Sequence, residues 1–373
     1  MTTSSEQNVR GPRTAIIGGG RLALAIARLL AANEFSIRIH ARRDDVRAEL
    51  RNALPGVHVT DDIGTAVTDA EIVFLAVPAP ALSEAAEAYG DYATGDQIVL
   101  TASRGVGPRF ALPHELIRAK TCVRKIGIFG GPLHVREIST GRAIPAVLAS
   151  QFSEVIAAVR KLAENTPVKI HPSRDLVGVE VAGAISNVTA LAAGMATALE
   201  LGETARGVIL THGLVEARRL GVALGASDST FTGLAGIGDL IPRNVSSTDR
   251  HWLVGARLAL GDSIEVALAA ADGKHVEGVV TAPEAAAKAR ALGLSLPLVS
   301  AVDRICRGEA EARESLESLL QQDLDLDRHD RQDRHDRPSQ TVLSPNPSPG
   351  PSPSTPSKDL TPHPPTPTSD PAS

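Results

Sequence analysis

The chain of 373 residues has 38 lysines and arginines against 43 aspartates and glutamates, which gives a formal net charge of −5 at pH 7. This length predicts two domains, while the charge provides no basic field for nucleic acid, and no apolar run is expected to reach the length of a membrane span. With two cysteines and no signal peptide, we expect a cytoplasmic protein whose thiols are reduced.

The first predicted elements are a buried strand, a glycine turn and the start of a helix, which follow one another without interruption. Gly18 can adopt the conformation of a tight turn, Gly20 lets the backbone approach a pyrophosphate, and the small Ala23 lets the helix lie close to the strand. The helix then directs unpaired N–H groups at the phosphates. Glycine runs of this kind also occur for packing reasons, but the context here predicts a dinucleotide site. The residues expected to bind the cofactor at this turn are Gly18, Gly20, Arg21 and Leu22.

Short β-branched segments recur after this turn, in the order of alternating strands and helices. Strands are expected at residues 36–40, 71–77, 97–101, 125–129, 144–149 and 168–171. Helices are expected at residues 22–30, 81–89 and 152–164. The pattern predicts a Rossmann domain, an α/β fold with a doubly wound parallel sheet, over residues 13–173.

The second strand runs into Ala41, Arg42 and Arg43, where an NAD site usually has an acidic residue that binds the ribose hydroxyls. A guanidinium can bind a 2′-phosphate through two hydrogen bonds, so we expect NADP to be the preferred cofactor, with NAD possible. Arg42 is the expected contact, and Arg43 assists it. The alternative is a solvated basic pair before Asp44 and Asp45 that takes no part in binding.

The pattern changes after residue 173, where strand-like alternation gives way to segments rich in alanine, leucine and glycine. Helices are expected at residues 175–200, 207–224 and 264–271, which predicts an all-helical substrate domain over residues 174–320. Residues 321–373 begin with Asp, Arg and His and continue with Pro, Ser and Thr, a composition typical of a disordered tail. Its His329 and His335 are interpreted as part of a solvated charged run rather than as metal ligands, and no metal site is predicted.

Within the helical domain, a run of sequence Phe-Thr-Gly-Leu-Ala-Gly-Ile-Gly-Asp begins at Phe231 and ends at Asp239. Together with residues 180–187 and 274–278, this run closely resembles the NAD(P)-dependent glycerol-3-phosphate dehydrogenase family. The resemblance extends over roughly residues 13–310. It also includes Val77-Pro78, Arg104-Gly105, Gly130-Gly131-Pro132, Glu137, Gly194-Met195, Thr211-His212-Gly213-Leu214 and Glu216.

The resemblance implies an active site between the two domains and hydride transfer between a nicotinamide and glycerol 3-phosphate, or a related small phosphorylated polyol. It assigns Asp239 as the active-site aspartate and Asn187 as the side-chain amide of the active site. It also assigns Arg250 to the binding of the substrate phosphate. The further residues implied to bind the cofactor are Pro78, Arg104, Arg250 and Glu277. The residues implied to bind the substrate are Gly131, Arg250, His251 and Asp239. The small substrate is the expected partner, a homodimer is possible, and the partner of the tail is unknown.

This sequence departs from the family at positions that matter for the chemistry. The family's lysine-glycine pair after the fourth strand is Arg104-Gly105 here, and the lysine of its Ala-Leu-Lys-Asn run is Ser186. Arg243 stands near a threonine of the family, and His251 replaces an asparagine. An arginine holds charge but is a poor proton donor, and a serine cannot supply the missing cation. The residues expected to form the catalytic centre are Asp239, Asn187, Arg104 and Ser186.

Histidines stand at three positions of the family's active site, His134, His212 and His251. Each one taken alone is interpreted as structural or solvent-facing, but together they suggest that a histidine has taken over proton transfer. Two functions therefore remain open. The first is an oxidoreductase acting on dihydroxyacetone phosphate or glycerol 3-phosphate with rebuilt acid–base chemistry. The alternative is a non-catalytic NAD(P)-binding sensor or scaffold that has lost turnover together with the catalytic lysine.

Overall fold

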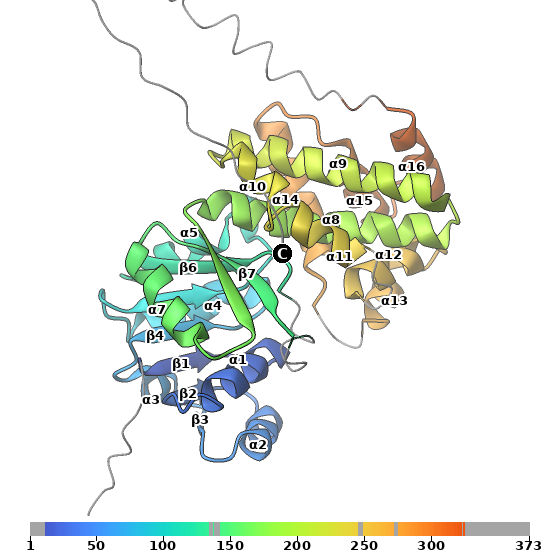
Figure 1. Cartoon of the computed structure of the whole chain (residues 1–373). Helices are drawn as coiled ribbons and strands as arrows, with labels where there is room; N and C mark the ends of the chain where they lie inside the picture. Colours follow the sequence, from blue (N-terminus) through green and yellow to red (C-terminus); the bar gives the residue numbers. More distant parts are fainter. Residues whose placement is uncertain are drawn as a thin grey trace, which may run out of the picture. The chain divides into compact units, whose positions relative to one another are not determined.

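The structure is a computed structural model, which describes residues 12–322 apart from 134–136, 138–141, 245–248 and 272–274, and also residue 324. Most of the predicted tail lies outside these described residues, as do His134, His329 and His335. The elements below therefore refer to the described part of the chain. Within it, a sheet with helices on both faces precedes a long series of helices, as the sequence predicts (Figure 1).

The amino-terminal part is built on an eight-stranded sheet with the strand order β3-β2-β1-β4-β5-β6-β7-β8. The strands are β1 (Thr14–Ile17), β2 (Ile37–His40), β3 (His58–Thr60), β4 (Ile72–Leu75), β5 (Ile98–Thr101), β6 (Lys125–Gly130), β7 (Ile144–Ala149) and β8 (Val168–Ser173). Neighbouring strands are parallel except β6 and β7, which are antiparallel. The predicted Rossmann sheet is therefore confirmed, with one reversed pair toward its edge.

Helices cover both faces of this sheet because alternate side chains of each strand point to opposite faces. Along β1, Ala15 and Ile17 pack in one core with Leu82, whereas Ile16 packs in the other core with Ala27. The helices of this part are α1 (Arg21–Ala31), α2 (Asp44–Ala53), α3 (Ile63–Val67), α4 (Ala79–Gly90), η1 (Pro108–Phe110), α5 (Pro113–Lys120) and α7 (Ser153–Ala163). Two buried layers thus fix the carboxyl ends of the central strands, each large apolar side chain contributing about 1.5–3 kcal/mol.

The helices that follow form one core, in which most of them pack directly on a central helix, α8 (Leu176–Ala198). They are α9 (Gly202–Ala223), α10 (Asp228–Thr232), α11 (Ile237–Asn244), α12 (Arg250–Ala259), α13 (Ile264–Ala269), α14 (Glu277–Ala291), α15 (Pro297–Cys306) and α16 (Ala312–Leu320). Glycines let α8 and α12 approach closely, because a Cβ at Gly194 would overlap the carbonyl of Trp252 and one at Gly255 would overlap that of Leu191. This contact holds the first turn of α12 beside the carboxyl-terminal part of α8.

Helix α8 corrects one expectation about apolar runs. It has 23 residues and contains an 18-residue window with a mean hydropathy of 1.6, so by length and composition it could cross a membrane. The expectation that no apolar run approaches such a length is therefore wrong. However, 94% of this apolar window is buried inside the protein, where α9, α12 and α14 pack against it. Its apolar composition is explained by its place at the centre of the helical core.

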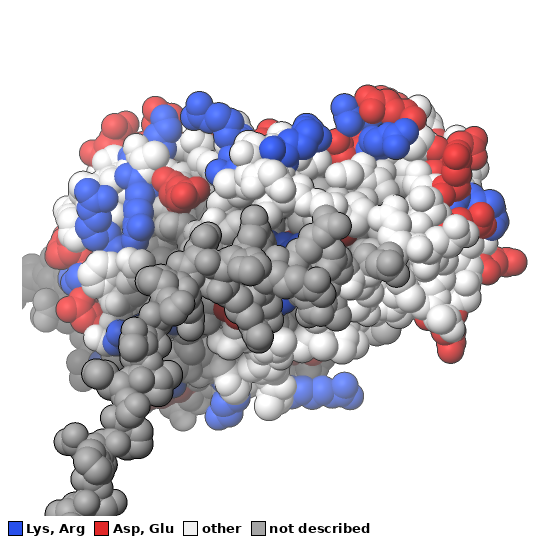
Figure 2. Space-filling model, turned by 90° about the horizontal axis from the view of Figure 1, so that it is seen from above, with Lys and Arg blue, Asp and Glu red and all other residues white. Residues whose placement is uncertain are grey.

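Charged side chains of both signs lie together on the face of the molecule seen from above. Figure 2 shows described lysines and arginines interspersed with aspartates and glutamates on this face, over both the sheet part and the helical part. Exposed pairs such as Arg313 with Glu317 and Arg307 with Glu309 have the same mixed character. The described residues of this face therefore form no broad field of one sign.

Candidate active site

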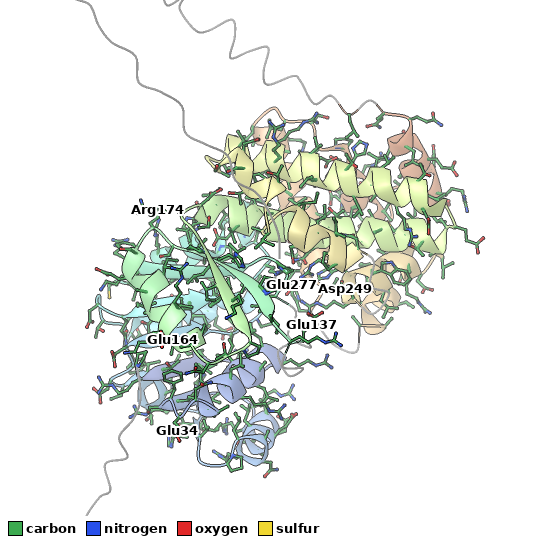
Figure 3. The ribbon with its side chains drawn as sticks, viewed as in Figure 1. Glu34, Glu137, Glu164, Arg174, Asp249 and Glu277 are labelled. Atoms are coloured by element: carbon green, nitrogen blue, oxygen red, sulfur yellow. The ribbon has the colours of Figure 1, made fainter. Side chains whose placement is uncertain are left out.

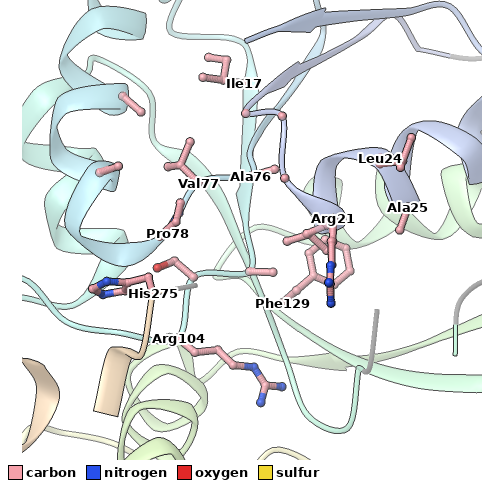
Figure 4. Close-up of a pocket in the computed structure, with 18 of the residues that line it drawn as sticks. Ile17, Arg21, Leu24, Ala25, Ala76, Val77, Pro78, Arg104, Phe129 and His275 are labelled. Atoms are coloured by element: carbon pink, nitrogen blue, oxygen red, sulfur yellow. The ribbon is translucent and has the colours of Figure 1, made fainter. Parts of the chain in front are cut away.

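A cavity of about 1420 Å³ lies where the ends of the parallel strands meet residues of α8, of α11 and of the starts of α12 and α14. Its wall includes Ile17 and His40 at the ends of β1 and β2, and Ala76 directly after β4. Ligands of doubly wound folds bind at this edge of the sheet. Figure 4 shows Arg104 and His275, which come from segments far apart in the sequence, among the side chains that line this cavity. The cavity is therefore the candidate site for both cofactor and substrate.

The structure brings most of the predicted site residues to this wall. Those that line it are Gly18, Gly20, Arg21, Leu22, Arg42, Arg43, Pro78, Arg104, Asn187, Arg250 and Glu277. Those that are not among the lining residues are Gly131, Ser186, Asp239 and His251. The cavity thus contains the entire predicted cofactor set, whereas part of the predicted catalytic and substrate sets lies behind residues of the wall.

The glycine turn has the geometry that a dinucleotide site needs. Gly18 has φ 129°, a conformation that favours glycine, and a Cβ there would overlap the carbonyl of Ala76. Gly20 is the N-cap of α1, has no side chain to cap the helix, and a Cβ there would meet nothing within 4 Å. The unpaired N–H groups at the start of α1 therefore face open space, which suits an anionic group.

The two arginines after β2 stand at the cavity, and each has a carboxylate beside it. Arg42 donates to Glu84 of α4 at 3.0 Å, and Arg43 donates to Asp45 at 3.0 Å through its Nε. The buried Arg47 fixes this loop by donating to the carbonyls of Ala41, at 2.8 Å, and Arg42, at 2.6 Å. The loop is held in place, while the two guanidinium groups stay exposed.

Arg104 and Asp239 form an ion pair that joins the sheet part to the helical part. Both carboxylate oxygens of Asp239 lie 2.7 Å from Nη1 of Arg104, and the other terminal nitrogen of Arg104 donates to the carbonyl of Gly131. The Asp239 side chain is only 1% exposed. Burial lowers the pKa of Arg104, and the charge of Asp239 opposes that shift. This pair fixes the guanidinium at the wall of the cavity.

Asn187 connects this pair to a second arginine. Its amide nitrogen donates to the backbone carbonyl of Arg104 at 3.2 Å, and its oxygen accepts from Nη1 of Arg243 at 3.0 Å. Arg243 lies one helical turn after Asp239 on α11, and its Nε is 3.7 Å from Asp239. Its Nη1 is 3.6 Å from Asp249. The predicted amide therefore bridges the backbone of Arg104 and the guanidinium of Arg243.

A second group of charges surrounds the start of α12 and of α14. Arg250 donates to Glu277 at 2.6 Å, and the ring of His251 lies 3.0 Å from Asp249 and 3.4 Å from Glu277. Figure 3 shows Asp249 and Glu277 near each other on the side of the helical part that faces the sheet. Burial would raise the pKa of both carboxyls, but the hydrogen bond and charge of His251, aided by Arg243 or Arg250, hold them well below their usual range.

Two of the predicted catalytic groups are placed where direct proton transfer is not supported. Ser186 is 2% exposed, and its hydroxyl has no hydrogen-bond partner in the part of the chain that the structure describes. His212 is buried on α9, where its Nδ1 lies 3.7 Å from the carboxylate of Glu216. That carboxylate accepts hydrogen bonds from the backbone N–H groups of Leu298 and Val299. His212 therefore belongs to the packing of α9 against α15, and neither side chain is among those that line the cavity.

Several polar lining residues were not among the site residues predicted from the sequence. Glu84, Asp249 and His275 all line the cavity. Asp249 could have been found, because it directly precedes Arg250 at a helix start and accepts the N–H of His251 at 2.8 Å as an N-cap. Glu84 gives no such signal, since its partner Arg42 is 42 residues away. His275 is half-buried, and burial lowers its pKa.

Two family models match the chain almost end to end over its described part. The model for the NAD-dependent glycerol-3-phosphate dehydrogenase N-terminus matches residues 13–156, and the model for the C-terminus matches residues 175–317. The chain belongs to this family. The resemblance and the fold class that the sequence predicts are thereby confirmed, and the relatives of this family member are NAD(P)-dependent enzymes.

Individual relatives agree with the family models. A glycerol-3-phosphate dehydrogenase [NAD(P)+] from Teredinibacter turnerae is 32% identical over 306 residues, which is 79% of this chain and 90% of that protein. One of the same name from Ectopseudomonas mendocina is 33% identical over 304 residues, covering 78% and 89%. The crystal structure of glycerol-3-phosphate dehydrogenase from Coxiella burnetii has the same fold, with a TM-score of 0.78 and 24% identity over 84% of this chain and 99% of that one.

The cavity of this family member fits a nicotinamide dinucleotide. The open space over Gly20 leaves room for a pyrophosphate at the start of α1. Among the described residues, the buried nitrogens of lining side chains that have no hydrogen-bond partner include Nε of Arg243, Nε of Arg250 and Nε2 of His275. Unpaired buried donors of this kind are costly unless a ligand or water satisfies them. The far end of the cavity is thus suited to a polar, anionic group beside the cofactor.

Proposed function

We propose that this chain catalyses hydride transfer between NADP(H) and dihydroxyacetone phosphate or glycerol 3-phosphate, or a related small phosphorylated polyol. The observation that carries the proposal is a single cavity that runs from a phosphate-binding glycine turn to an end lined by Arg104, Arg243 and Arg250. Its relatives, named as glycerol-3-phosphate dehydrogenases, support the same substrate class.

Different residues along the cavity would bind different parts of the cofactor and of the substrate. When bound, the cofactor supplies or accepts the hydride. Gly18 and the start of α1 would hold its pyrophosphate, and Glu277 would contact it near the reacting end. Arg250, with help from His251 behind it, would bind the substrate phosphate, because a guanidinium matches the geometry of phosphate oxygens. Asn187 and Arg104, the latter fixed by Asp239, would surround the reacting carbon.

Arg250 provides the most direct test of this assignment. NADPH oxidation in the presence of dihydroxyacetone phosphate is measured for the wild type, for Arg250→Gln, and for Arg257→Gln as a matched control on the same helix. We expect turnover in the wild type and in the control. In Arg250→Gln we expect the KM for dihydroxyacetone phosphate to rise by about 10- to 200-fold, because one hydrogen bond between charged groups is lost. Arg257 pairs with Asp262 and does not line the cavity.

Absence of turnover in the wild type, together with tight NADPH binding, would contradict the proposal and favour the non-catalytic alternative. The observation that makes this alternative worth testing is the missing cation at Ser186, whose hydroxyl is buried without a partner. Turnover that is equal in Arg250→Gln and in the control would contradict the role of Arg250 while leaving the enzyme assignment in place.

The preference for NADP(H) rests on Arg42 and Arg43. Both side chains line the cavity. An NAD site usually has a carboxylate directly after the second strand to bind the free ribose hydroxyls, and no carboxylate stands at that place here. We expect Arg42→Ala to raise the dissociation constant of NADPH about tenfold and to leave that of NADH unchanged, measured by calorimetric titration. Arg160→Ala, an exposed arginine on α7, serves as the control. Equal affinities of the wild type for NADH and NADPH would contradict the preference.

A further inference from the structure

Three arginine side chains stand at the substrate end of the cavity, and they differ in how well their charge is matched. Arg104 has both oxygens of Asp239 at 2.7 Å, and Arg250 has Glu277 at 2.6 Å. Arg243 has carboxylates only at 3.6 and 3.7 Å, beyond hydrogen-bond distance. Among the described residues, its one hydrogen bond goes to the neutral amide oxygen of Asn187, at 3.0 Å.

The side chain of Arg243 is also nine-tenths buried. Its exposed fraction is 10%, it lines the cavity, and its Nε has no hydrogen-bond partner. The two carboxylates near Arg243 are in ion-pair range but beyond hydrogen-bond distance, and they leave its Nε–H without an acceptor among the described residues. A buried donor without an acceptor is costly, and the cost is removed when an anionic or partly charged oxygen binds to it. The guanidinium of Arg243 can therefore donate a hydrogen bond to a ligand oxygen in addition to balancing the two carboxylates.

Arg243 stands beside the position at which the cation of this family is missing. It hydrogen-bonds Asn187, the immediate neighbour of Ser186 on α8, and the Ser186 hydroxyl is itself buried and without a partner. A positive charge that a lysine would bring from α8 is thus present, but it comes from α11. Arg104 is less suited to this role, because Asp239 and the Gly131 carbonyl already occupy its terminal nitrogens.

We infer that Arg243 contacts the reacting carbonyl oxygen of the substrate and stabilises the negative charge that develops on it. The inference rests on the proposed function. As a hydride forms the new C–H bond at the carbonyl carbon, the π electron pair moves to the oxygen, where Arg243 meets it. Water that enters the cavity then gives the oxygen its proton, since a guanidinium holds its own protons across the working pH range.

The test exchanges the cation between the two helices. Turnover and NADPH binding are measured for Arg243→Thr, Ser186→Lys and the double variant Ser186→Lys/Arg243→Thr, with Arg257→Thr as the control. We expect Arg243→Thr to lower kcat about 100- to 1000-fold, the usual effect of losing one preorganised charge contact, while the dissociation constant of NADPH stays within about threefold. The double variant should regain much of the lost kcat.

The pH profile gives a second readout that a merely structural role would not move. With glycerol 3-phosphate and NADP⁺, the double variant should lose activity as the pH rises toward the ordinary lysine pKa of about 10.4, and the wild type should not lose it in this way. Arg243→Lys, which retains a cation, should keep more turnover than Arg243→Thr. This comparison remains informative if the threonine variant is poorly folded, and melting temperatures identify that case.

The outcomes separate this inference from the proposed function. A folded Arg243→Thr variant with wild-type kcat would overturn the inference and leave the proposed function standing. Equal losses in Arg243→Lys and Arg243→Thr, without recovery in the double variant, would also overturn it. A wild-type chain without turnover on either substrate would overturn the proposed function and this inference with it.

Discussion

At the scale of single residues, neighbouring charges decide the protonation of the buried carboxyls at the site. Glu277 is buried and Asp249 is partly buried, which favours the neutral acid, yet the pKa of each is held well below its usual range. The contacts responsible come from His251, which lies between the two carboxyls, and from Arg250 and Arg243. The acidic and basic members of this group therefore depend on one another for their charge.

This dependence predicts how stability responds to pH when Glu277 is changed. Because the pKa of Glu277 is lower in the folded than in the unfolded chain, its contribution is complete above the ordinary glutamate pKa of about 4.3 and is lost as the pH falls below it. We expect Glu277→Gln to lower the free energy of unfolding at pH 7 by about 1–3 kcal/mol, less than for a fully buried pair because the Arg250 side chain is 38% exposed.

The difference between wild type and Glu277→Gln should shrink as the pH is lowered through 4, in denaturant titrations at a series of pH values. Glu265→Gln is the matched control, since hydrogen bonds to its own backbone and to Ser263 also lower the pKa of Glu265, but that side chain is fully exposed. A difference that stays constant with pH would mean that Glu277 acts through packing rather than through its charge.

Most of the residues predicted from the sequence line the cavity, but the sequence could not say which of them touch. Arg104 and Asp239 are 135 residues apart, and the family resemblance gave each a place without indicating that they pair. The motif around the glycine turn was more informative, because a strand, a turn and a helix start fix their own geometry locally. The position of Ser186 in the sequence could not show that its side chain lies behind the cavity wall, because that burial depends on how α8 is rotated against its neighbours.

At the scale of elements, the crossing of α8 and α12 positions the second half of the site, because α12 begins with Arg250 and His251. A Cβ at Gly255 would overlap the carbonyl of Leu191, so α12 would have to move away from α8. We expect Gly255→Ala to lower the free energy of unfolding by about 1–3 kcal/mol, the usual cost of overpacking, and to raise the KM for the substrate. Denaturant unfolding and steady-state kinetics measure the two effects.

Gly207→Ala gives a control of opposite sign. Gly207 lies inside α9, and a Cβ there would meet nothing within 4 Å. An alanine in a helix interior is about 0.5–1 kcal/mol more favourable than glycine, so this variant should be slightly more stable than the wild type. If both variants changed stability in the same direction, the close contact between α8 and α12 would not be the cause.

The elements themselves were predictable to different degrees, for physical reasons. Buried parallel strands such as β4 and β5 were located closely, since continuous apolar runs bounded by polar residues leave little choice. β3, with three residues, is too short to show a pattern, and α9 begins at Gly202, earlier than expected, because its first turn contains few apolar residues. The antiparallel pairing of β6 with β7 depends on long-range packing that no local pattern encodes.

At the scale of the whole molecule, the two halves of the cavity are tied together by more than the Arg104–Asp239 pair. Glu180 of α8 accepts the backbone N–H of His114 at 2.8 Å, and its other oxygen lies 2.5 Å from the ring of the same histidine. Burial raises the pKa of Glu180, and the contacts with His114 oppose that shift. Both ties are buried, so the helical part and the sheet part share their stability around the site.

The carboxy-terminal segment should be separable from this fold. α16 ends at Leu320 and buries Leu316 and Leu319, whereas the sequence beyond Gln322 has few apolar residues to bury. We expect truncation after Gln322 to leave the melting temperature and the dissociation constant of NADPH unchanged. Truncation after Ala310, which also removes α16, is the control and should lower the melting temperature clearly, because it exposes apolar surface of α8 and α15. A large fall in melting temperature for the first truncation would show instead that the segment packs on the fold and contributes to its stability.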